Sequence, residues 1–473
     1  MHKAVLWVRR ILAASVFAGF VALFAGCSFK HLAFLAKWQF VPAVLAGSTV
    51  IIVAIVVATL LFGRIYCGVC CPLGILQDVA FALFRHKSQG VHTKARTIAR
   101  YVVLTAFLAA GLCGFGFSWI EPYGLFGRIA TSIWIALTFG LAIFLLAAWR
   151  GRVWCNWVCP AGTFLGGLSR RAPFSLKIDE SKCIGCKQCE RACRASAIKI
   201  CGKSSGQGND GQAGGVIDAT LCVQCRDCTV LCPKGAIVSK IGRSADAEAA
   251  VEPPQTTQSE GVSRRSFMVG TAAVGAALAA EAADEKIFDG GFADVTDPGI
   301  DVRNASLKPA GSHSIKNFQT KCVGCQLCVK ACPNKVLRPS VRLKDFGQPE
   351  MAFDKGFCTV DCTRCSEVCP AGAIESIPSS MKENIHIGEA VWHKDRCIAS
   401  AEGVSCTACY RHCPVNAIAL VEGPNGAKIP VVDADKCIGC GACEHVCPAR
   451  PMPALTVKAY ERHREIWPAM QTA

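Results

Sequence analysis

The stretch CIGCKQCERAC, residues 183–193, places four cysteines at the spacing C-x2-C-x2-C-x3-C. The stretch CVQCRDCTVLC, residues 222–232, repeats this spacing. Such runs supply thiolates to iron–sulfur clusters, and in two-cluster proteins the fourth cysteine of each run binds the other run's cluster. Four cysteines can also bind zinc, but two adjoining runs favour iron–sulfur. We therefore assign one [4Fe–4S] cluster to Cys183, Cys186, Cys189 and Cys232, and a second to Cys193, Cys222, Cys225 and Cys228.

Short β-like stretches flank both runs. KID and VID precede the runs, and AIKI and AIVS follow them. These stretches predict short strands, which gives the α+β arrangement of a two-cluster bacterial ferredoxin. Arg194 stands where such a run usually has proline after its fourth cysteine, and this costs a turn constraint but no ligand.

Four more runs follow later in the chain, and all four end in Cys-Pro. The middle two have longer first gaps, x3 and x8 in place of x2. Each still supplies four thiols, so we expect four further [4Fe–4S] clusters, while the pairing of these runs stays open. Their predicted ligands are Cys322, Cys325, Cys328, Cys332, Cys358, Cys362, Cys365, Cys369, Cys397, Cys406, Cys409, Cys413, Cys437, Cys440, Cys443 and Cys447.

The chain lacks the motifs of several other cofactors. The 32 cysteines include no C-x-x-C-H pattern for haem attachment, and no P-loop or dinucleotide fingerprint occurs. The six runs alone account for about six clusters. The sequence therefore predicts a carrier of single electrons with no bond-making chemistry on a soluble substrate.

Four apolar stretches lie in the first 150 residues, at roughly 11–27, 41–62, 102–120 and 130–149. None contains Lys, Arg, Asp or Glu, and each is close to the ~20 residues of a membrane-spanning helix. The net charge of +16 is concentrated in this part, because residues 1–175 have 16 Lys and Arg against 2 Asp and Glu. That distribution is typical of membrane topology and argues against nucleic-acid binding.

The basic residues also predict an orientation. Thirteen Lys and Arg fall on the side of the N-terminus, the loop between the second and third stretches, and the segment after the fourth, whereas three fall on the other side. By the positive-inside rule both ends of this helical unit lie in the cytoplasm of a bacterial inner-membrane protein.

A twelve-residue pattern occurs twice, as GRIYCGVCCPLG from Gly63 and as GRVWCNWVCPAG from Gly151. Each copy follows an even-numbered apolar stretch, so both begin at the same membrane face. The repeat brings together four thiols that are candidate cofactor-binding residues, as a metal or cluster site or as two dithiol pairs: Cys67, Cys71, Cys155 and Cys159.

The stretch SRRSFMVGTAAVGAALAA, residues 263–280, has the form of a twin-arginine export signal although it lies in mid-chain. A domain that acquires its clusters inside the cell has to cross the membrane folded, which this route allows. We expect residues 263–283 to be an internal signal or a fifth span, and residues 284–473 to be periplasmic.

The first ~240 residues resemble NapH, a membrane quinol-dehydrogenase ferredoxin, in their four spans, two C-x3-C-P motifs and two ferredoxin runs. Residues from Ser263 onward resemble the twin-arginine-exported NapG and the related MauM, with CTACYRHCP as a specific match. The resemblance implies a fusion that oxidises quinol from the membrane quinone pool and delivers electrons to a periplasmic respiratory reductase system. Its partner would be a c-type cytochrome or a molybdenum reductase.

The fold class expected is an α-helical membrane bundle of four spans plus a fifth, followed by α+β bacterial-ferredoxin-like domains. We expect a membrane domain at 1–175, a cytoplasmic two-cluster domain at 176–241, a linker at 242–262 and a periplasmic four-cluster domain at 284–473. The alternatives are a maturation factor that reduces a metal centre of a partner enzyme, and a scaffold whose clusters only hold the fold. Candidate proton acceptors, none favoured over another, are Glu121, Tyr123, His31, Asp78 and His86.

Overall fold

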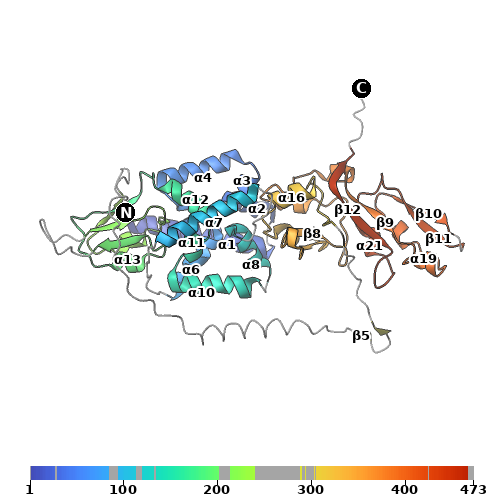
Figure 1. Cartoon of the computed structure of the whole chain (residues 1–473), viewed down its shortest axis with the longest axis horizontal. Helices are drawn as coiled ribbons and strands as arrows, with labels where there is room; N and C mark the ends of the chain where they lie inside the picture. Colours follow the sequence, from blue (N-terminus) through green and yellow to red (C-terminus); the bar gives the residue numbers. More distant parts are fainter. Residues whose placement is uncertain are drawn as a thin grey trace, which may run out of the picture.

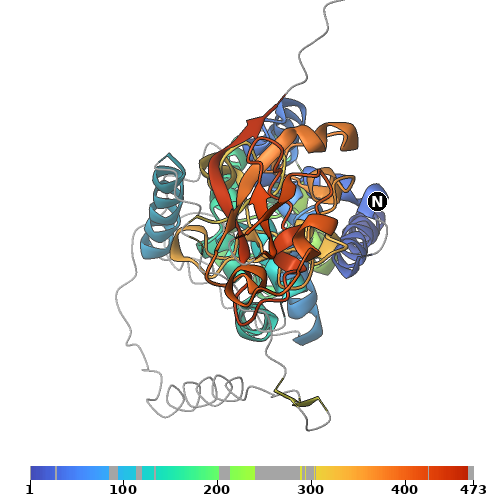
Figure 2. The same ribbon diagram turned by 90° about the vertical axis from the view of Figure 1, so that its right-hand side faces the viewer.

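The computed structural model describes residues 2–26, 29–84, 94–112, 120–132, 135–201, 214–239, 288–289, 293–294, 303, 305–423 and 426–466. Three parts lie one after another along the long axis of the molecule (Figure 1). A helical part, residues 2–172, is in the middle. A small α+β part, residues 176–239, lies at one end, and a large α+β part, residues 303–466, lies at the other (Figure 1). Seen from the end of the large part, its strands lie in front of the helical part (Figure 2).

The helical part consists of the 24-residue α1, the 19-residue α7 and a set of shorter helices. Its buried centre joins apolar side chains of α1 to the two Cys-Pro segments. The elements are α1 (His2–Ala25), α2 (Phe29–Lys37), α3 (Phe40–Leu45), α4 (Thr49–Phe62), α5 (Ile65–Val69), α6 (Pro72–Phe84), α7 (Lys94–Leu112), α8 (Pro122–Thr131), the π-helix η1 (Ala136–Gly140), α10 (Leu141–Arg150), α11 (Val153–Trp157) and α12 (Pro160–Ser169).

The predicted spans differ in how the structure forms them. Among the described residues, the segment Ala4–Ala25 of α1 alone is both long and apolar enough to cross a membrane. The stretch 41–62 divides into α3 and α4, and the stretch 130–149 is shared by α8, η1 and α10. The 14 residues of α4 reach about 21 Å at 1.5 Å per residue, against a hydrocarbon core of about 30 Å. The four-span bundle therefore stays a prediction.

The two copies of the repeated pattern fold alike. In each copy a helix ends at a glycine of positive φ, 78° at Gly63 and 76° at Gly151. An arginine and a five-residue helix follow, and the proline after the second cysteine begins the next helix. Positive φ is the conformation that glycine adopts at no steric cost. The sequence repeat thus gives two equal turns at one end of the helical part.

The small α+β part has the expected strands on either side of each run. β1 (Leu176–Ile178) pairs antiparallel with β4 (Ile237–Ser239), and β2 (Ile198–Cys201) pairs antiparallel with β3 (Gly214–Ile217). The helices α13 (Gln188–Ala192) and α14 (Asp227–Leu231) each precede the fourth cysteine of a run. The chain thus crosses over so that each run's last cysteine lies near the other run.

The large α+β part contains the remaining four runs, preceded by the short hairpin β5 (Phe288–Asp289) and β6 (Ala293–Asp294). Its strands form three antiparallel pairs, β7–β8, β10–β11 and β9–β12. The elements are α16 (Ile315–Lys321), α17 (Leu327–Ala331), β7 (Leu337–Pro339), η3 (Leu343–Asp345), β8 (Pro349–Met351), α18 (Arg364–Val368), η4 (Ser379–Asn384), β9 (Ile385–Trp392), α19 (Ile398–Ala401), α20 (Ala408–Arg411), β10 (Ile418–Glu422), β11 (Lys428–Val432), α21 (Ala442–His445) and β12 (Leu455–Glu465).

His313 links the beginning and the end of this part, because its ring lies between the carboxylates of Glu375 and Glu465. Hydrogen bonding to Glu375 raises the pKa of His313. Partial burial opposes this shift, and hydrogen bonding to Glu465 adds to it. Burial lowers the pKa of the neighbouring His463 to about 4, so that ring stays neutral above pH 5. Protonated His313 therefore stabilises the fold below pH ~6.5, and this contribution is lost as pH rises through the raised pKa.

We accordingly expect His313→Gln to lower the thermal stability more at pH 6 than at pH 9. We expect the loss in free energy of unfolding to be below about 1 kcal/mol, because His313 and its two glutamate partners are exposed to solvent. Thermal unfolding of both proteins across this pH range measures the difference. A difference that grows with pH contradicts the assigned pairing.

Candidate iron–sulfur and thiol sites

Most of the cysteine runs have the same backbone turn between their second and third cysteines. In four of the six runs a residue of left-handed conformation stands immediately before the short helix that carries the third cysteine: Lys187, Arg226, Gln326 and Gly441. The two runs with longer first gaps differ, because Thr363 and Thr407 precede their helices with φ of −117° and −127°. The regular spacing therefore corresponds to a turn that wraps the first three cysteines around one cavity.

In the small α+β part the cysteines line two cavities, each completed by the other run's fourth cysteine. We name them site 1, lined by Cys183, Cys186, Cys189 and Cys232, and site 2, lined by Cys193, Cys222, Cys225 and Cys228. These are the two ligand sets that the spacing predicts. The structure places each set around its own cavity.

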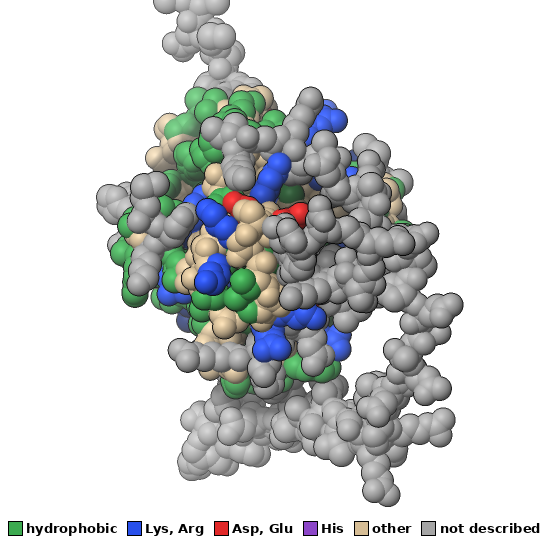
Figure 3. Space-filling view, turned by 90° about the vertical axis from the view of Figure 1, so that its left-hand side faces the viewer, with side chains coloured by type: hydrophobic (Ala, Val, Ile, Leu, Met, Phe, Trp, Pro, Cys, Tyr) green, Lys and Arg blue, Asp and Glu red, His purple; other side chains and the backbone are tan. Residues whose placement is uncertain are grey.

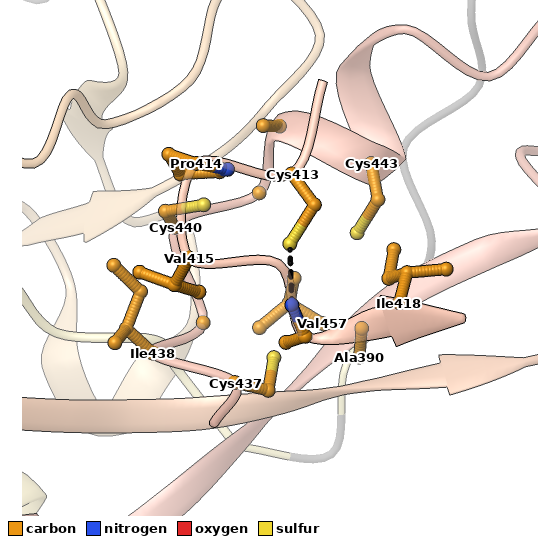
Figure 4. A pocket seen from close by; sticks show the side chains of 14 residues that line it. Ala390, Cys413, Pro414, Val415, Ile418, Cys437, Ile438, Cys440, Cys443 and Val457 are labelled. Atoms are coloured by element: carbon orange, nitrogen blue, oxygen red, sulfur yellow. Dashed lines mark hydrogen bonds between the residues drawn. The ribbon is translucent and has the colours of Figure 1, made fainter. Parts of the chain in front are cut away.

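In the large α+β part the runs pair consecutively, which the sequence left open. Cys369 of the fourth run completes the cavity of the third, and Cys413 of the fifth run completes that of the sixth (Figure 4). We name these cavities site 3, lined by Cys322, Cys325, Cys328 and Cys369, and site 5, lined by Cys413, Cys437, Cys440 and Cys443.

The remaining cysteines form two further groups. Cys332 lies within electrostatic reach of Cys358 and Cys365, and Cys447 lies within reach of Cys409. We name these groups site 4, with Cys332, Cys358, Cys362 and Cys365, and site 6, with Cys397, Cys406, Cys409 and Cys447.

The donor chemistry of these sites fits [4Fe–4S] clusters. Each site presents four thiols, and the linings of sites 2, 3 and 5 are otherwise mainly apolar. Backbone N–H groups donate to the sulfur of a fourth cysteine, as Ala197 does to Cys193 and Ala236 to Cys232, both at 3.2 Å. Such hydrogen bonds are one way in which proteins set cluster potentials. Among the described residues no group of three or more His, Cys, Asp or Glu side chains is spaced for one metal ion.

The repeated pattern brings together the thiol quartet, which consists of Cys67, Cys71, Cys155 and Cys159. All four side chains are at most 5% exposed, and they lie within electrostatic reach of one another. The two copies interlock, because Arg64 Nη2 donates to the Cys155 carbonyl at 3.3 Å and Arg152 Nη1 donates to the Cys67 carbonyl at 2.7 Å. Each arginine of the repeat thus supports the other copy's first cysteine.

Asp78 is a buried carboxylate beside this quartet. It binds Arg152 at 2.7 Å, Arg9 at 2.8 Å and Arg194 at 3.2 Å. The sequence suggested Asp78 as a proton acceptor, whereas the structure gives its two oxygens to three arginines. The structure also shows that Arg194 pairs with Asp227 as well as with Asp78. Sequence reasoning missed these two ion pairs of Arg194.

The small α+β part docks on the thiol quartet through its second site. Arg64 Nη1 donates to the Thr220 carbonyl at 2.9 Å, and Asn156 Nδ2 donates to the Ala195 carbonyl at 2.8 Å. These two carbonyls are next to the ligand loops of site 2. Site 2 therefore lies between site 1 and the helical part.

The large α+β part docks on the opposite end of the helical part through site 3. Arg128 Nε of α8 donates to the Gly324 carbonyl at 3.0 Å. A Cβ atom on Gly127 would lie 2.3 Å from the Cys325 carbonyl oxygen, so only glycine permits this approach. The ligand loop of site 3 thus lies directly on α8.

Two of the suggested proton acceptors lie at this second contact. Glu121 is buried and caps α8 by accepting hydrogen bonds from the backbone of Tyr123, at 3.0 Å, and of Gly124. The Tyr123 ring packs near Phe20 and Phe24 of α1. The side chains of His31 and His86 lie outside the described residues, as do residues 263–283.

Known protein families match the same segments. A family described as a 4Fe-4S dicluster domain matches residues 182–236, 321–373 and 404–450, and one described as a 4Fe-4S binding domain matches residues 45–89 and 132–178. An uncharacterized protein of Methanocaldococcus jannaschii is 29% identical over 239 residues, which are 49% of this chain and 85% of that protein.

Two named relatives identify the family. The methylamine utilization ferredoxin-type protein MauM of Methylorubrum extorquens is 36% identical over 152 residues, which are 30% of this chain and 68% of MauM. The ferredoxin-type protein NapG of Escherichia coli is 32% identical over 162 residues, which are 32% of this chain and 69% of NapG. With this coverage and with three matched dicluster segments, the chain belongs to the family of NapG and MauM ferredoxin-type proteins, which transfer electrons through multiple 4Fe-4S clusters.

Proposed function

We propose that the chain is a membrane-bound electron carrier that oxidises quinol and passes the electrons to a periplasmic respiratory reductase system. One observation carries this proposal: the two α+β parts lie at opposite ends of the helical part, each with a cysteine site at the contact (Figure 1). A protein that moves electrons from one side of a membrane to the other needs this arrangement.

The six cysteine sites follow one another in a row on the two sides of the helical part. Sites 1 and 2 share a pair of runs, as do sites 3 and 4 and sites 5 and 6. Sites 4 and 5 adjoin, because the Cys358 backbone N–H donates to the Cys440 carbonyl at 3.0 Å. A [4Fe–4S] cluster held by each site would supply a one-electron carrier. The order of the sites is then 1, 2, helical part, 3, 4, 5 and 6.

The thiol quartet is a candidate for a further centre in this row. The segments 45–89 and 132–178, which match a 4Fe-4S binding domain, contain three and two cysteines respectively. Neither segment alone supplies four thiolates, but the quartet does. The quartet also lies beside the buried side chains of Arg64 and Arg152. Their positive charge would offset the negative charge of a thiolate-bound centre.

The membrane orientation remains part of the proposal. The excess of Lys and Arg in residues 1–175 supports a cytoplasmic small α+β part, since that part docks beside the two Gly-Arg turns. The large α+β part would then be periplasmic, exported through the internal twin-arginine segment. Candidate acceptors there are a c-type cytochrome or a molybdenum reductase.

The experiment is quinol-driven reduction of the purified full chain combined with a topology assay. We expect a short-chain quinol to bleach the visible iron–sulfur absorbance of the purified chain in detergent. We also expect a C-terminal tag to be digested by protease from outside intact spheroplasts. A maturation factor would instead show no steady-state turnover with quinol and an acceptor. A tag that stays protected would place all six sites in the cytoplasm and overturn the proposal.

A further inference from the structure

Site 1 differs from the other sites in its exposure. Cys186 is the one exposed cysteine among the described residues. The neighbouring Ile184 is 57% exposed, although its side chain is apolar. Site 1 also lies at the end of the row, away from the helical part. It is therefore the site most open to a second protein.

The rim of site 1 is strongly basic. Lys182, Lys187 and Lys234 line the cavity, all three are exposed, and no Asp or Glu lines it. Lys and Arg side chains are spread over the described surface of this end of the molecule (Figure 3). The rim thus combines a positive ring, an exposed apolar residue and an exposed cysteine ligand.

The lysines are not a general requirement of such a site. The linings of sites 3 and 5 contain no charged residue, and that of site 2 contains Arg226 alone. Neutralising a negatively charged cluster therefore does not explain three lysines at one rim. Solvent-exposed charge of one sign around a redox site instead steers an oppositely charged partner and sets its orientation.

We propose that this rim is the docking face for an acidic, soluble one-electron carrier, such as a small iron–sulfur or flavin protein. Ile184 would supply the apolar centre of the contact and the lysines its charged border. The reduced carrier would lose one electron to the [4Fe–4S] cluster that site 1 would hold, and no bond would form or break. The inference rests on the electron-carrying part of the proposed function and is independent of quinol as the other reductant.

The test measures binding of the full chain in detergent to a small acidic [2Fe–2S] ferredoxin used as a probe. We expect saturable binding at low salt, and K182E/K187E/K234E should weaken it by about tenfold or more. The control K316E/K428E/K458E has the same change in net charge at exposed lysines of the large α+β part and should bind as the unchanged chain does. Stopped-flow reduction by the reduced probe should slow in parallel with binding.

Three results overturn the inference: no binding at low salt, equal weakening in both triple variants, or equally tight binding of a basic cytochrome. Quinol-driven bleaching in the same preparations separates the two proposals. If probe binding is absent while quinol reduction is intact, only the proposed docking face is contradicted. If the probe binds as expected while quinol does not reduce the chain, only the proposed quinol oxidation is contradicted.

Discussion

Replacing Cys369 with alanine is expected to remove one cluster and to stop electron delivery into the large α+β part. Cys369 lies in the fourth run, yet it lines site 3 together with three cysteines of the third run. Site 3 is the site that contacts α8. Its loss therefore breaks the row at the junction, whereas the helical part and the small α+β part keep all of their sites.

The measurements are iron content and quinol-driven reduction of the full chain. We expect about four fewer irons per chain, bleaching of only those clusters that lie before the junction, and turnover with a periplasmic acceptor near background. The matched control is Cys70→Ala, because Cys70 lies outside the thiol quartet and is only partly buried. It should leave iron content and turnover unchanged. Full turnover in Cys369→Ala would show that site 3 is not on the path.

The variant Cys365→Ala distinguishes consecutive pairing from other pairings. Cys365 is four residues before Cys369 but belongs to site 4. The two variants should lose different clusters, which appear as different missing signals in electron paramagnetic resonance spectra of the reduced protein. Loss of the same signal in both would contradict the assignment.

Replacing Asp78 with alanine is expected to destabilise the protein by about 3–5 kcal/mol. The Arg152 side chain is fully buried, and Asp78 bonds to its Nε and Nη2, both at 2.7 Å. Removing the carboxylate leaves this guanidinium buried without a countercharge, which costs far more than the loss of an exposed pair. The same change also releases Arg9 and Arg194, which join α1 and the small α+β part to α6.

Thermal unfolding in detergent measures this loss, and limited proteolysis reports release of the small α+β part. The control is Asp433→Ala, whose partner Lys436 is 65% exposed and recovers water, so we expect a smaller loss. The double variant Asp78→Leu with Arg152→Met should regain part of the stability, since it removes the buried Arg152 charge together with its countercharge, while Arg9 still loses its partner. A loss within about 0.5 kcal/mol for Asp78→Ala, typical of surface changes, would mean that the pair does not hold the junction.

Cysteine spacing predicted the ligand sets of sites 1 and 2, because a regular run folds its first three cysteines around one cavity through local turns. The pairing of the last four runs could not be predicted in the same way. The fourth cysteine of a run points to a partner run, and only chain packing decides which one. In the two runs with longer first gaps, the residue after the second cysteine also lacks the left-handed conformation, as Thr363 and Thr407 show.

The apolar stretches were less informative than the cysteines. Composition located α1, but it missed the breaks at Gly47 and at Ser132 that divide the expected second and fourth spans. Hydropathy averages over a window and is insensitive to one or two residues that end a helix. The repeat of Gly-Arg and Cys-Pro was the better guide, since identical short motifs form identical turns.

The sequence by itself predicted the cysteine sets of sites 1 and 2 and the common face of the two Cys-Pro repeats, because both follow from local spacing and repetition. Tertiary structure alone decided the order of the sites, the three arginines on Asp78 and the contact of Arg128 with the site 3 loop. These features join residues far apart in the chain. They arise because buried charged groups and carbonyl oxygens of one part have their hydrogen-bond partners in another part. A local sequence pattern does not specify such long-range partners.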